Sequence, residues 1–433
     1  MNYYNEIECM DRDALTSLQS DRLRRVVERV YNNNYAYRNK MDLAGIKPSD
    51  IKSIEDITKL PFTVKQDLRD SYPFGFFSAP KKDIIRIHAS SGTTGKLTVV
   101  GYTKSDIDIW AEVCARSLVC AGADEHSLVH IAYGYGLFTG GLGMHYGSEK
   151  LGCATIPVSS GNTMRQITLM KDFGADVICC TPSYAIYLAD EIEKNNIDKS
   201  ELKLKAGIFG AEPWSDEMRK EIESRLNIKA YNIYGLSEIC GPGVSMECKA
   251  QDGMHIFEDH FYPEIINPDT LEPVADGERG ELVITTLTKE GIPLIRYRTR
   301  DITAVNREKC DCGRTMVRMG RVFGRTDDML IIRGVNVFPS QIETVIMNVG
   351  GGVQPHYQII VDRKDSLDVM EIRIEISESV FSDEIKVVEA LRKRLEHDMQ
   401  SMLGISATIK LVSPNSLPRS EGKAKRVMDL RKL

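Results

Sequence analysis

The sequence predicts an α/β protein in which a large, multi-layer N-terminal α/β domain precedes a small α+β domain. Short β-rich runs alternate with helical runs from about residue 84 to residue 300, as in a mainly parallel sheet covered by helices. The pattern changes near residue 325, after which strands and one long helix predominate. We therefore expect domains at residues 1–325 and 326–433.

Length and composition limit the class of protein. The chain has 433 residues, more than one folding unit usually contains. With 42% hydrophobic and 27% charged residues, it has the composition of a globular protein. No apolar run approaches the roughly 20 residues of a membrane span, and the first residues do not resemble a signal peptide. The net charge of −6 gives no reason to expect nucleic acid. We expect a cytoplasmic protein that binds small molecules and no membrane.

The elements follow from apolar periodicity. A helix capped by Asp11 or Asp13 is expected near the N-terminus. Strands are expected at residues 84–87, 128–131, 177–180 and 206–209, with helices at 104–121, 163–173 and 182–195. An antiparallel part is expected around residues 281–287. The C-terminal domain is expected to contain strands at 329–333, 357–361, 369–376 and 407–412 and a helix at 381–403.

A polar loop after the first expected strand is a candidate anion site. It packs two glycines, four hydroxyls and a lysine into seven residues: Ser90, Ser91, Gly92, Thr93, Thr94, Gly95 and Lys96. Free backbone amides with hydroxyl and ammonium donors can surround a phosphate. Only two residues separate the glycines, so the loop is not a Walker A motif. A polar turn without a ligand is the alternative.

Two further motifs offer groups that suit a nucleotide. Tyr234 could stack on a purine, and Glu238 could hold Mg²⁺ against a phosphate. Asp301 could accept both hydroxyls of a ribose. Taken singly, the first motif could be an ordinary turn at the end of a strand, and the second a surface run of ion pairs.

Taken in order, these motifs resemble the adenylate-forming superfamily of acyl-CoA synthetases. The wider resemblance rests on residues 90–96, 234–238, 297–301, 324–328 and 418–423. Residues 60–69 and 133–141 resemble one branch of it, the phenylacetate-CoA ligases. The resemblance implies that an arylacetate, phenylacetate first, is converted with ATP and Mg²⁺ into an acyl-adenylate and then transferred to CoA. Both steps need charge neutralisation more than a covalent nucleophile.

The resemblance also implies roles for single residues. The loop at 90–96 would hold the β- and γ-phosphates, Glu238 the Mg²⁺, and Asp301 the ribose. Catalysis would use Glu238, Arg325 at a phosphate or the ribose, and Lys423 between the attacking carboxylate and the α-phosphate. For Lys423, a solvated lysine of a basic tail is the alternative. The remaining expected ATP-binding residues are Lys65, Gly210, Ala211, Glu212, Pro213, Tyr231, Asn232, Ile233, Tyr234, Gly235 and Ser237.

The implied second half-reaction depends on a mobile C-terminal domain. Asp327 matches the hinge about which that domain would rotate. Rotation would withdraw Lys423 and bring Arg333, Gly334 and Asn336 to CoA, with Gly334 leaving room for close approach. A homodimer is expected from the resemblance alone.

Aromatic residues beside glycines form a candidate slot for the aryl ring. The expected set is Tyr133, Tyr135, Gly136, Phe138 and Gly235. An ordinary turn at the end of a strand has the same ingredients.

Cys248, His255, Cys310 and Cys312 form a candidate zinc site. Three thiolates and one imidazole make the Cys₃His set of structural Zn²⁺, and four ligands leave no open position for catalysis. His260 is a rival fourth ligand, and unligated thiols are the alternative.

Two other functions remain open. An enzyme of the same fold could act on another aryl or heteroaryl acid, use an acceptor other than CoA, or adenylate a deazaflavin cofactor. A nucleotide-binding regulatory or scaffold protein could have lost turnover, but the combination of Glu238, Asp301 and Lys423 argues against it.

Overall fold

A computed structural model of the chain describes residues 3–90, 97–326, 330–333, 335–364, 367–381, 385–418 and 426–431. The chain divides into two compact units. The first comprises residues 1–180, 200–211 and 229–321, and the second comprises residues 181–199, 212–228 and 322–433. The predicted domain boundary at residue 325 stays a prediction. No helix in the described ranges is long and apolar enough to cross a membrane.

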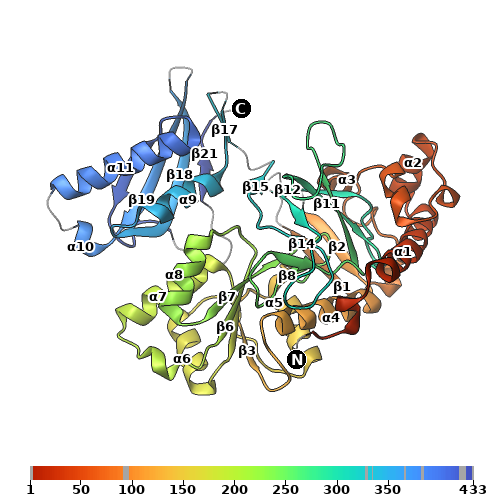
Figure 1. Cartoon of the computed structure of the whole chain (residues 1–433), viewed down its shortest axis with the longest axis horizontal. Coiled ribbons are helices and arrows are strands. Elements are labelled where there is room, and N and C mark those ends of the chain that lie inside the picture. Colours follow the sequence, from red (N-terminus) through yellow and green to blue (C-terminus); the bar gives the residue numbers. More distant parts are fainter. Residues whose placement is uncertain are drawn as a thin grey trace. The chain divides into compact units, whose positions relative to one another are not determined.

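The predicted mixed α/β fold is confirmed. The first unit contains a nine-stranded sheet with the order β13-β14-β9-β8-β7-β6-β5-β3-β4. Figure 1 labels β3, β6, β7, β8 and β14 of this sheet. Strands β4, β3, β5, β6 and β7 run parallel, and the others pair antiparallel. The bounds are β3 (Leu128–Ile131), β4 (Ala154–Ile156), β5 (Val177–Cys180), β6 (Ala206–Phe209), β7 (Lys229–Tyr234), β8 (Ser245–Glu247), β9 (Met254–Ile256), β13 (Val305–Asn306) and β14 (Arg318–Met319).

Helices of the N-terminal part begin where the sequence places their caps. The carboxylate of Asp11 accepts the N–H of Ala14 at 2.9 Å, which starts α1 (Arg12–Asn33) and confirms the expected cap. The other helices of the first unit are α2 (Tyr35–Leu43), α3 (Lys65–Asp70), α4 (Lys104–Cys120), α5 (Gly140–Leu151) and α6 (Thr163–Phe173). Two helices of the second unit, α7 (Pro182–Lys194) and α8 (Asp216–Leu226), precede residue 325 in the sequence.

Antiparallel pairs complete the first unit. The hairpin of β1 (Arg86–Ser90) and β2 (Thr98–Tyr102) flanks the candidate anion loop, whose residues 91–96 lie outside the described residues. The strand expected at 84–87 begins at Arg86 in the structure, because a 3₁₀ turn (Lys81–Asp83) precedes it. As expected, the segment that follows the parallel sheet is antiparallel: β10 (Phe261–Ile266) pairs with β11 (Gly280–Thr286), which pairs with β12 (Tyr297–Thr303).

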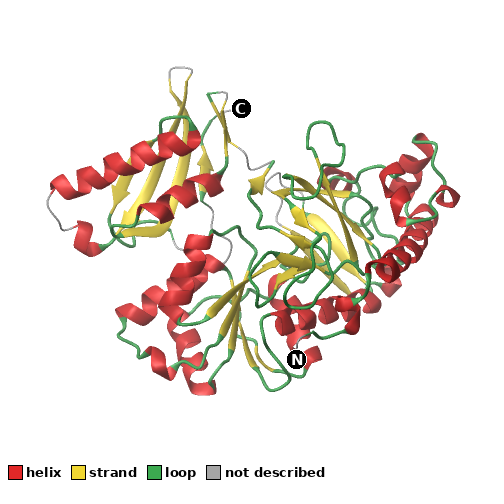
Figure 2. Ribbon diagram, in the orientation of Figure 1, coloured by secondary structure: helices red, strands yellow, loops and turns green. Residues whose placement is uncertain are grey.

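The second unit contains one mixed sheet, with parallel and antiparallel pairs, in the order β20-β19-β18-β21. Figure 2 shows α9 and α11 lying along one face of this sheet, and Ile342, Ile359 and Leu395 join the three elements in one core. The helix expected at 381–403 corresponds to the end of α10 and to α11, and residues 382–384 lie outside the described residues. The bounds are β15 (Gly324–Arg325), β16 (Leu330–Ile332), β17 (Val335–Val337), α9 (Pro339–Val349), β18 (Val353–Lys364), β19 (Leu367–Ile376), α10 (Glu378–Phe381), α11 (Ile385–Leu403), β20 (Thr408–Val412) and β21 (Val427–Asp429).

Candidate active site

A tight turn after β7 carries Glu238. The N–H groups of Ile239, Cys240 and Gly241 all donate to the carbonyl of Leu236, at 3.0, 3.1 and 2.8 Å. A Cβ at Gly235 would lie only 1.8 Å from the carbonyl oxygen of Gly241, so this position requires glycine. The turn places Glu238 at the carboxyl end of a parallel strand, where α/β sheets bind their ligands.

Glu238 faces two of the other predicted phosphate-site residues. Its Oε1 lies 2.7 Å from Nζ of Lys65, the first residue of α3, and 3.5 Å from Oγ of Ser90, the last residue of β1. Only 3% of the Glu238 side chain is exposed, whereas 32% of Lys65 is. A buried carboxylate thus faces an accessible cation beside the loop at 91–96. The structure brings these three predicted residues together, while Ser91, Gly92, Thr93, Thr94, Gly95 and Lys96 fall outside the described residues.

Tyr234 and Asp301 are joined directly. The Tyr234 hydroxyl donates to Oδ2 of Asp301 at 2.6 Å, and both residues are buried. Asp301 comes from β12, so the contact connects the parallel sheet with the antiparallel one. The predicted purine and ribose residues therefore form one hydrogen-bonded pair.

The residues after β6 meet the end of β7. A Cβ at Gly210 would lie 2.4 Å from the carbonyl oxygen of Ile233, and Ala211 adopts a positive φ of 71°. Asn232 donates its N–H to Glu247 at 2.7 Å, and Tyr231 is buried. Within the second unit, Glu212 accepts the N–H of Ser183 at 2.8 Å. These contacts fix the backbone around the predicted adenine pocket.

The predicted aryl residues differ in exposure. Tyr133 is buried and its hydroxyl lies 3.4 Å from the Ile208 carbonyl, whereas Phe138 is 44% exposed. The Tyr135 hydroxyl contacts Nδ1 of His145 at 3.2 Å, and burial raises the pKa of Tyr135 above its usual value. His145 in turn lies 3.1 Å from Glu149 on the same helix, α5. The contact of His145 with Tyr135 was not predicted from the sequence, because His145 follows a glycine-rich run without helical periodicity.

The second unit holds the predicted CoA and lid residues. Arg325 ends β15, and exposed Arg333 donates to the Ser406 carbonyl at 2.6 Å. Asp327, Gly334 and Lys423 lie outside the described residues. Asn336 belongs to β17.

Lys289 is a site residue that the sequence did not reveal. Only 6% of it is exposed, and its ammonium donates to the carbonyls of Glu238 and Ile239 at 2.9 and 2.7 Å. Burial lowers its pKa below the usual value for lysine. A lone lysine in the run 287–290 gives no sequence signal for such contacts with a turn 50 residues earlier.

The four predicted zinc ligands converge. Their ligand atoms all lie within 4.8 Å of one another, and all four residues are buried. The Cys248 and Cys310 sulfurs are 3.7 Å apart, and the Cys312 sulfur lies 3.4 Å from Nε2 of His255. The donor set and its spacing fit a tetrahedral metal. The rival His260 instead contacts Thr288 and Asp259, at 2.8 and 3.0 Å.

The surroundings of this cluster match a metal site. Nδ1 of His255 lies 3.2 Å from the Met316 carbonyl, which leaves Nε2 directed at the thiols. The Arg314 guanidinium contacts the Cys312 sulfur at 3.6 Å and Glu8 at 2.6 Å. Arg314 therefore places a cation, itself paired with Glu8, beside the sulfur of Cys312.

Comparisons with known proteins show the family of the chain. Residues 39–288 match the family model "AMP-binding enzyme", and residues 334–431 match "AMP-binding enzyme C-terminal domain". The chain is 51% identical to the phenylacetate-coenzyme A ligase of Thermus thermophilus, covering 100% of both chains. It is 52% identical to the phenylacetate-coenzyme A ligase of Escherichia coli, covering 99% of this chain and 97% of the relative.

Solved structures extend the match. The crystal structure of 2-hydroxyisobutyryl-CoA ligase in the postadenylation state with R3-HIB-AMP has a TM-score of 0.93 and 30% identity, covering 99% and 92% of the two chains. The same enzyme with 2-HIB-AMP and CoA has a TM-score of 0.74 at 30% identity, covering 100% and 93%. The chain therefore belongs to the phenylacetate-CoA ligase family of AMP-binding enzymes, a family of AMP-forming acid–CoA ligases.

Proposed function

We propose that this enzyme activates an arylacetate, phenylacetate first, and transfers it to CoA. Four relatives named phenylacetate-CoA ligase, at 50–52% identity, support the choice of acid. The observation that carries the proposal is buried Glu238 facing Lys65 and Ser90 beside the candidate phosphate loop. The products would be arylacetyl-CoA, AMP and pyrophosphate, which suits a role in phenylacetate catabolism.

The first half-reaction must bring two anions together. A carboxylate oxygen attacks the α-phosphorus of ATP, and pyrophosphate leaves. Lys65 and the loop at 90–96 would bind the leaving phosphates, and Lys423 would neutralise the charge that develops between carboxylate and α-phosphate. Asp301, held by Tyr234, would accept the ribose hydroxyls, and Arg325 would contact a phosphate or the ribose.

Mg²⁺ would be held by Glu238. The carboxylate is buried and has a displaceable cation as its counter-charge, which fits an ion that requires oxygen ligands. When bound, Mg²⁺ would neutralise phosphate charge during the transfer. Lys65 would then be free to turn from Glu238 toward the phosphates.

The second half-reaction would use the C-terminal residues. The CoA thiol attacks the acyl carbon of the adenylate, and AMP leaves with one oxygen of the original carboxylate. Arg333, Gly334 and Asn336 would line the approach of CoA after rotation about Asp327. Tyr133, Tyr135, Gly136, Phe138 and Gly235 would surround the aryl ring in both half-reactions.

The cluster of Cys248, His255, Cys310 and Cys312 would hold one structural Zn²⁺. Support comes from the convergence of four buried ligand atoms within 4.8 Å and from the orienting contact of His255 with Met316. The ion would join the segment after β8 to the loop before β14. None of the ten cysteines forms a disulfide, which supports a reducing, cytoplasmic location as part of the proposal, and a homodimer is expected as well.

Pyrophosphate release tests the proposed activity. The enzyme is offered a panel of aryl, acyl and amino acids with Mg²⁺ and ATP, with and without CoA, and thioesters are measured by mass spectrometry. We expect arylacetates to give the highest kcat/KM and a thioester only with CoA. Pyrophosphate exchange without any thioester would favour another acceptor, and preference for a non-aryl acid would overturn the assignment of the aryl slot.

A further inference from the structure

Lys289 combines burial with an unusual set of partners. Its ammonium donates to the backbone carbonyls of Glu238 and Ile239, at 2.9 and 2.7 Å, and lies 4.6 Å from the centre of the Tyr102 ring. Among the ion pairs of the described residues, none joins Lys289 to a carboxylate. Burying an ammonium is costly, and breaking its contacts would leave the charge uncompensated. The backbone carbonyls that Lys289 contacts therefore indicate which segment this lysine stabilises.

The turn that carries Glu238 is held by hydrogen bonds to three successive backbone carbonyls. The Tyr102 hydroxyl donates to the carbonyl of Ser237 at 3.1 Å, and Lys289 takes the next two carbonyls. The Ser237 side chain also contacts Oγ1 of Thr139 at 3.1 Å. Because these hydrogen bonds hold the backbone of Glu238, its carboxylate is directed at Lys65.

Both supports are themselves rigid. The Tyr102 ring stacks on Trp110 with centroids 5.1 Å apart and an interplanar angle of 18°. The loop of Lys289 is anchored by Asp106, whose carboxylate accepts the N–H groups of Glu290 and Gly291 at 2.7 and 2.9 Å.

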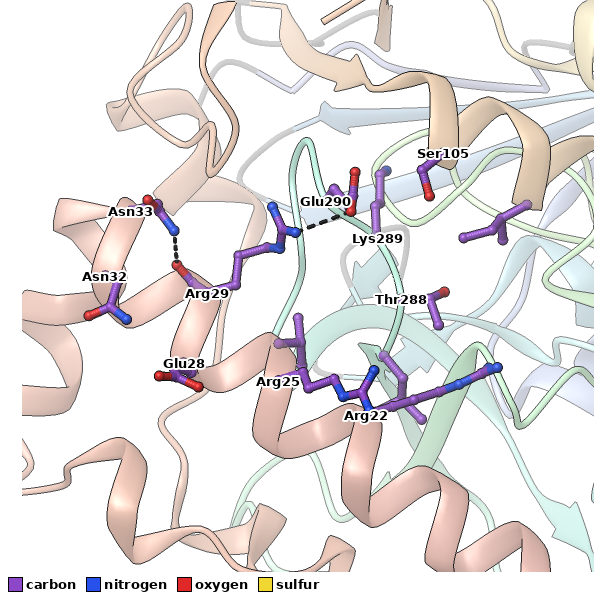
Figure 3. Close-up of a pocket in the computed structure, with 13 residues that line it drawn as sticks. Arg22, Arg25, Glu28, Arg29, Asn32, Asn33, Ser105, Thr288, Lys289 and Glu290 are labelled. Carbon is purple, nitrogen blue, oxygen red and sulfur yellow. Dashed lines mark hydrogen bonds and ion pairs between the residues drawn. The ribbon is translucent and has the colours of Figure 1, made fainter. Parts of the chain in front are cut away.

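A second anchor lies toward solvent. Glu290 pairs with Arg29 of α1 at 3.1 Å and accepts a hydrogen bond from Thr103 at 3.0 Å. Figure 3 shows Lys289 and Glu290 on this loop, at the edge of a pocket of about 640 Å³ lined by Arg22, Arg25 and Arg29 of α1. These three arginines pair with Asp259, Asp21 and Glu290, so their charges are already balanced by carboxylates of the protein.

We propose that Lys289 is a positioning residue that holds the Ser237–Ile239 turn so that Glu238 can bind Mg²⁺. This inference rests on the proposed role of Glu238 as the Mg²⁺ ligand. Residues that orient a metal ligand typically change metal affinity or activity about 10–100-fold when they are replaced. The contacts of Lys289 are with the backbone of the turn and with the Tyr102 ring, so we expect its replacement to act through the position of Glu238 and hence on the Mg²⁺ requirement.

The test is a Mg²⁺ titration of arylacetate-dependent pyrophosphate exchange by the full chain, at saturating arylacetate and fixed ATP. Lys289→Met, which keeps the length of the side chain but removes its charge and donors, is expected to raise the Mg²⁺ concentration for half-maximal rate about tenfold. The KM for the arylacetate is expected to stay within about twofold. Tyr102→Phe, which removes only the hydrogen bond to Ser237, is expected to act in the same direction by about threefold.

Arg38→Met is the matched control. Arg38 also donates to two backbone carbonyls, of Tyr31 and Asn32 at 2.8 and 2.6 Å, but it belongs to α2 and does not contact the turn. The Arg38→Met enzyme is expected to have the Mg²⁺ requirement of the unmodified enzyme. Tm values of all variants are recorded, because a merely structural role would lower Tm without moving the Mg²⁺ requirement.

A fourth variant separates the two hypotheses. Glu238→Gln is expected to raise the Mg²⁺ requirement more than either other variant. If it does not, the proposed Mg²⁺ ligand is wrong. If Glu238→Gln acts as expected while Lys289→Met and Tyr102→Phe keep the unmodified Mg²⁺ requirement, the positioning role is wrong. If Lys289→Met does not fold, Lys289→Gln, which removes the charge and shortens the side chain, replaces it, and an unmodified Mg²⁺ requirement in that variant would overturn the positioning role.

Discussion

At the scale of single residues, the site is arranged around charges that need partners. Glu238 is buried and carries a negative charge that Lys65 offsets at 2.7 Å. Lys289 is a buried cation that two carbonyls and an aromatic ring accommodate. Such an arrangement is stable only while each charge is compensated. In the proposed function, the carboxylate of Glu238 would accept a metal ion and the ammonium of Lys65 would accept phosphates.

Replacing Lys423 tests the first half-reaction. Lys423→Ala is expected to lower the rate of adenylation about 10²–10³-fold, because the proposed role of Lys423 is to contact the reacting oxygens in that step alone. CoA attack on a supplied acyl-adenylate is expected to keep its rate. Single-turnover measurements of each half-reaction distinguish the two. Equal loss in both would contradict the role, and Lys425→Ala, in the same basic segment, is the control.

Single residues also show what the sequence could reveal about the site. Tyr234, Glu238 and Asp301 were predicted as nucleotide contacts, and the structure joins Tyr234 to Asp301 and Glu238 to Lys65. The role of Lys289 could not be predicted, because its partners are backbone carbonyls that any residue supplies. A sequence pattern reports side-chain chemistry and does not report which carbonyls lie unpaired in the fold.

At the scale of elements, buried parallel strands were predicted well. The four buried residues of β5 form a continuous apolar run, which is the pattern of a strand covered on both faces. α5 was missed, because Gly140, Gly141, Gly143 and Gly147 are poor helix formers. Its glycines instead permit close packing on α4: a Cβ at Gly147 would lie 2.3 Å from Cβ of Cys114. This helix is stabilised by its packing against α4, and such tertiary contacts cannot be predicted from the local sequence.

The candidate zinc cluster joins segments that are far apart in sequence. Protein purified without chelator is expected to carry about one Zn²⁺ per chain. Cys310→Ser is expected to lower metal content and Tm together, since structural zinc binding is linked to folding. Elemental analysis and calorimetry measure both.

Cys153→Ser is the control for the zinc prediction. Cys153 is buried but lies outside the cluster, and its sulfur contacts the Asp124 carbonyl at 3.1 Å. Its metal content is expected to stay unchanged. Finding no zinc in the unmodified protein would return the four residues to unligated side chains. Chelated, folded enzyme that keeps adenylation activity would support a structural role for the ion.

A buried histidine in β3 gives the protein a pH-dependent stability. Burial lowers the pKa of His130, which contacts Gln166 at 2.6 Å. The unfolded chain therefore takes up a proton near pH 6.5 that the folded chain does not, so stability falls as pH falls below about 6.5. His130→Gln is expected to reduce the loss in free energy of unfolding between pH 7.5 and 5.5, as measured with urea.

His126→Gln is the matched control for this pH prediction. The side chain of His126 is 85% exposed, so its removal is expected to leave the pH dependence of stability unchanged. An equal effect of both substitutions would show that burial of His130 is not the cause.

At the scale of the whole molecule, two units must cooperate in two successive reactions. The first unit holds Lys65, Glu238 and Asp301, whereas Arg325 and Arg333 belong to the second. We expect one unit to bind the nucleotide throughout and the other to exchange its contacts between half-reactions. The proposed hinge at Asp327 would make that exchange possible.

Asp327→Pro tests this exchange. Proline fixes φ near −65°, so a hinge that must change its backbone dihedrals is expected to keep one half-reaction and lose most of the other. Separate rates of adenylation and thioester formation measure the effect. Wild-type rates in both would show that the hinge lies elsewhere.

Isotope transfer tests the central claim most directly. The enzyme is incubated with ATP, Mg²⁺, CoA and phenylacetate carrying ¹⁸O in both carboxylate oxygens, and the products are analysed by mass spectrometry. The adenylate mechanism predicts AMP with one ¹⁸O, formed together with an equal amount of phenylacetyl-CoA that retains the other. Formation of ADP, or of AMP that carries no ¹⁸O, would contradict activation through an acyl-adenylate.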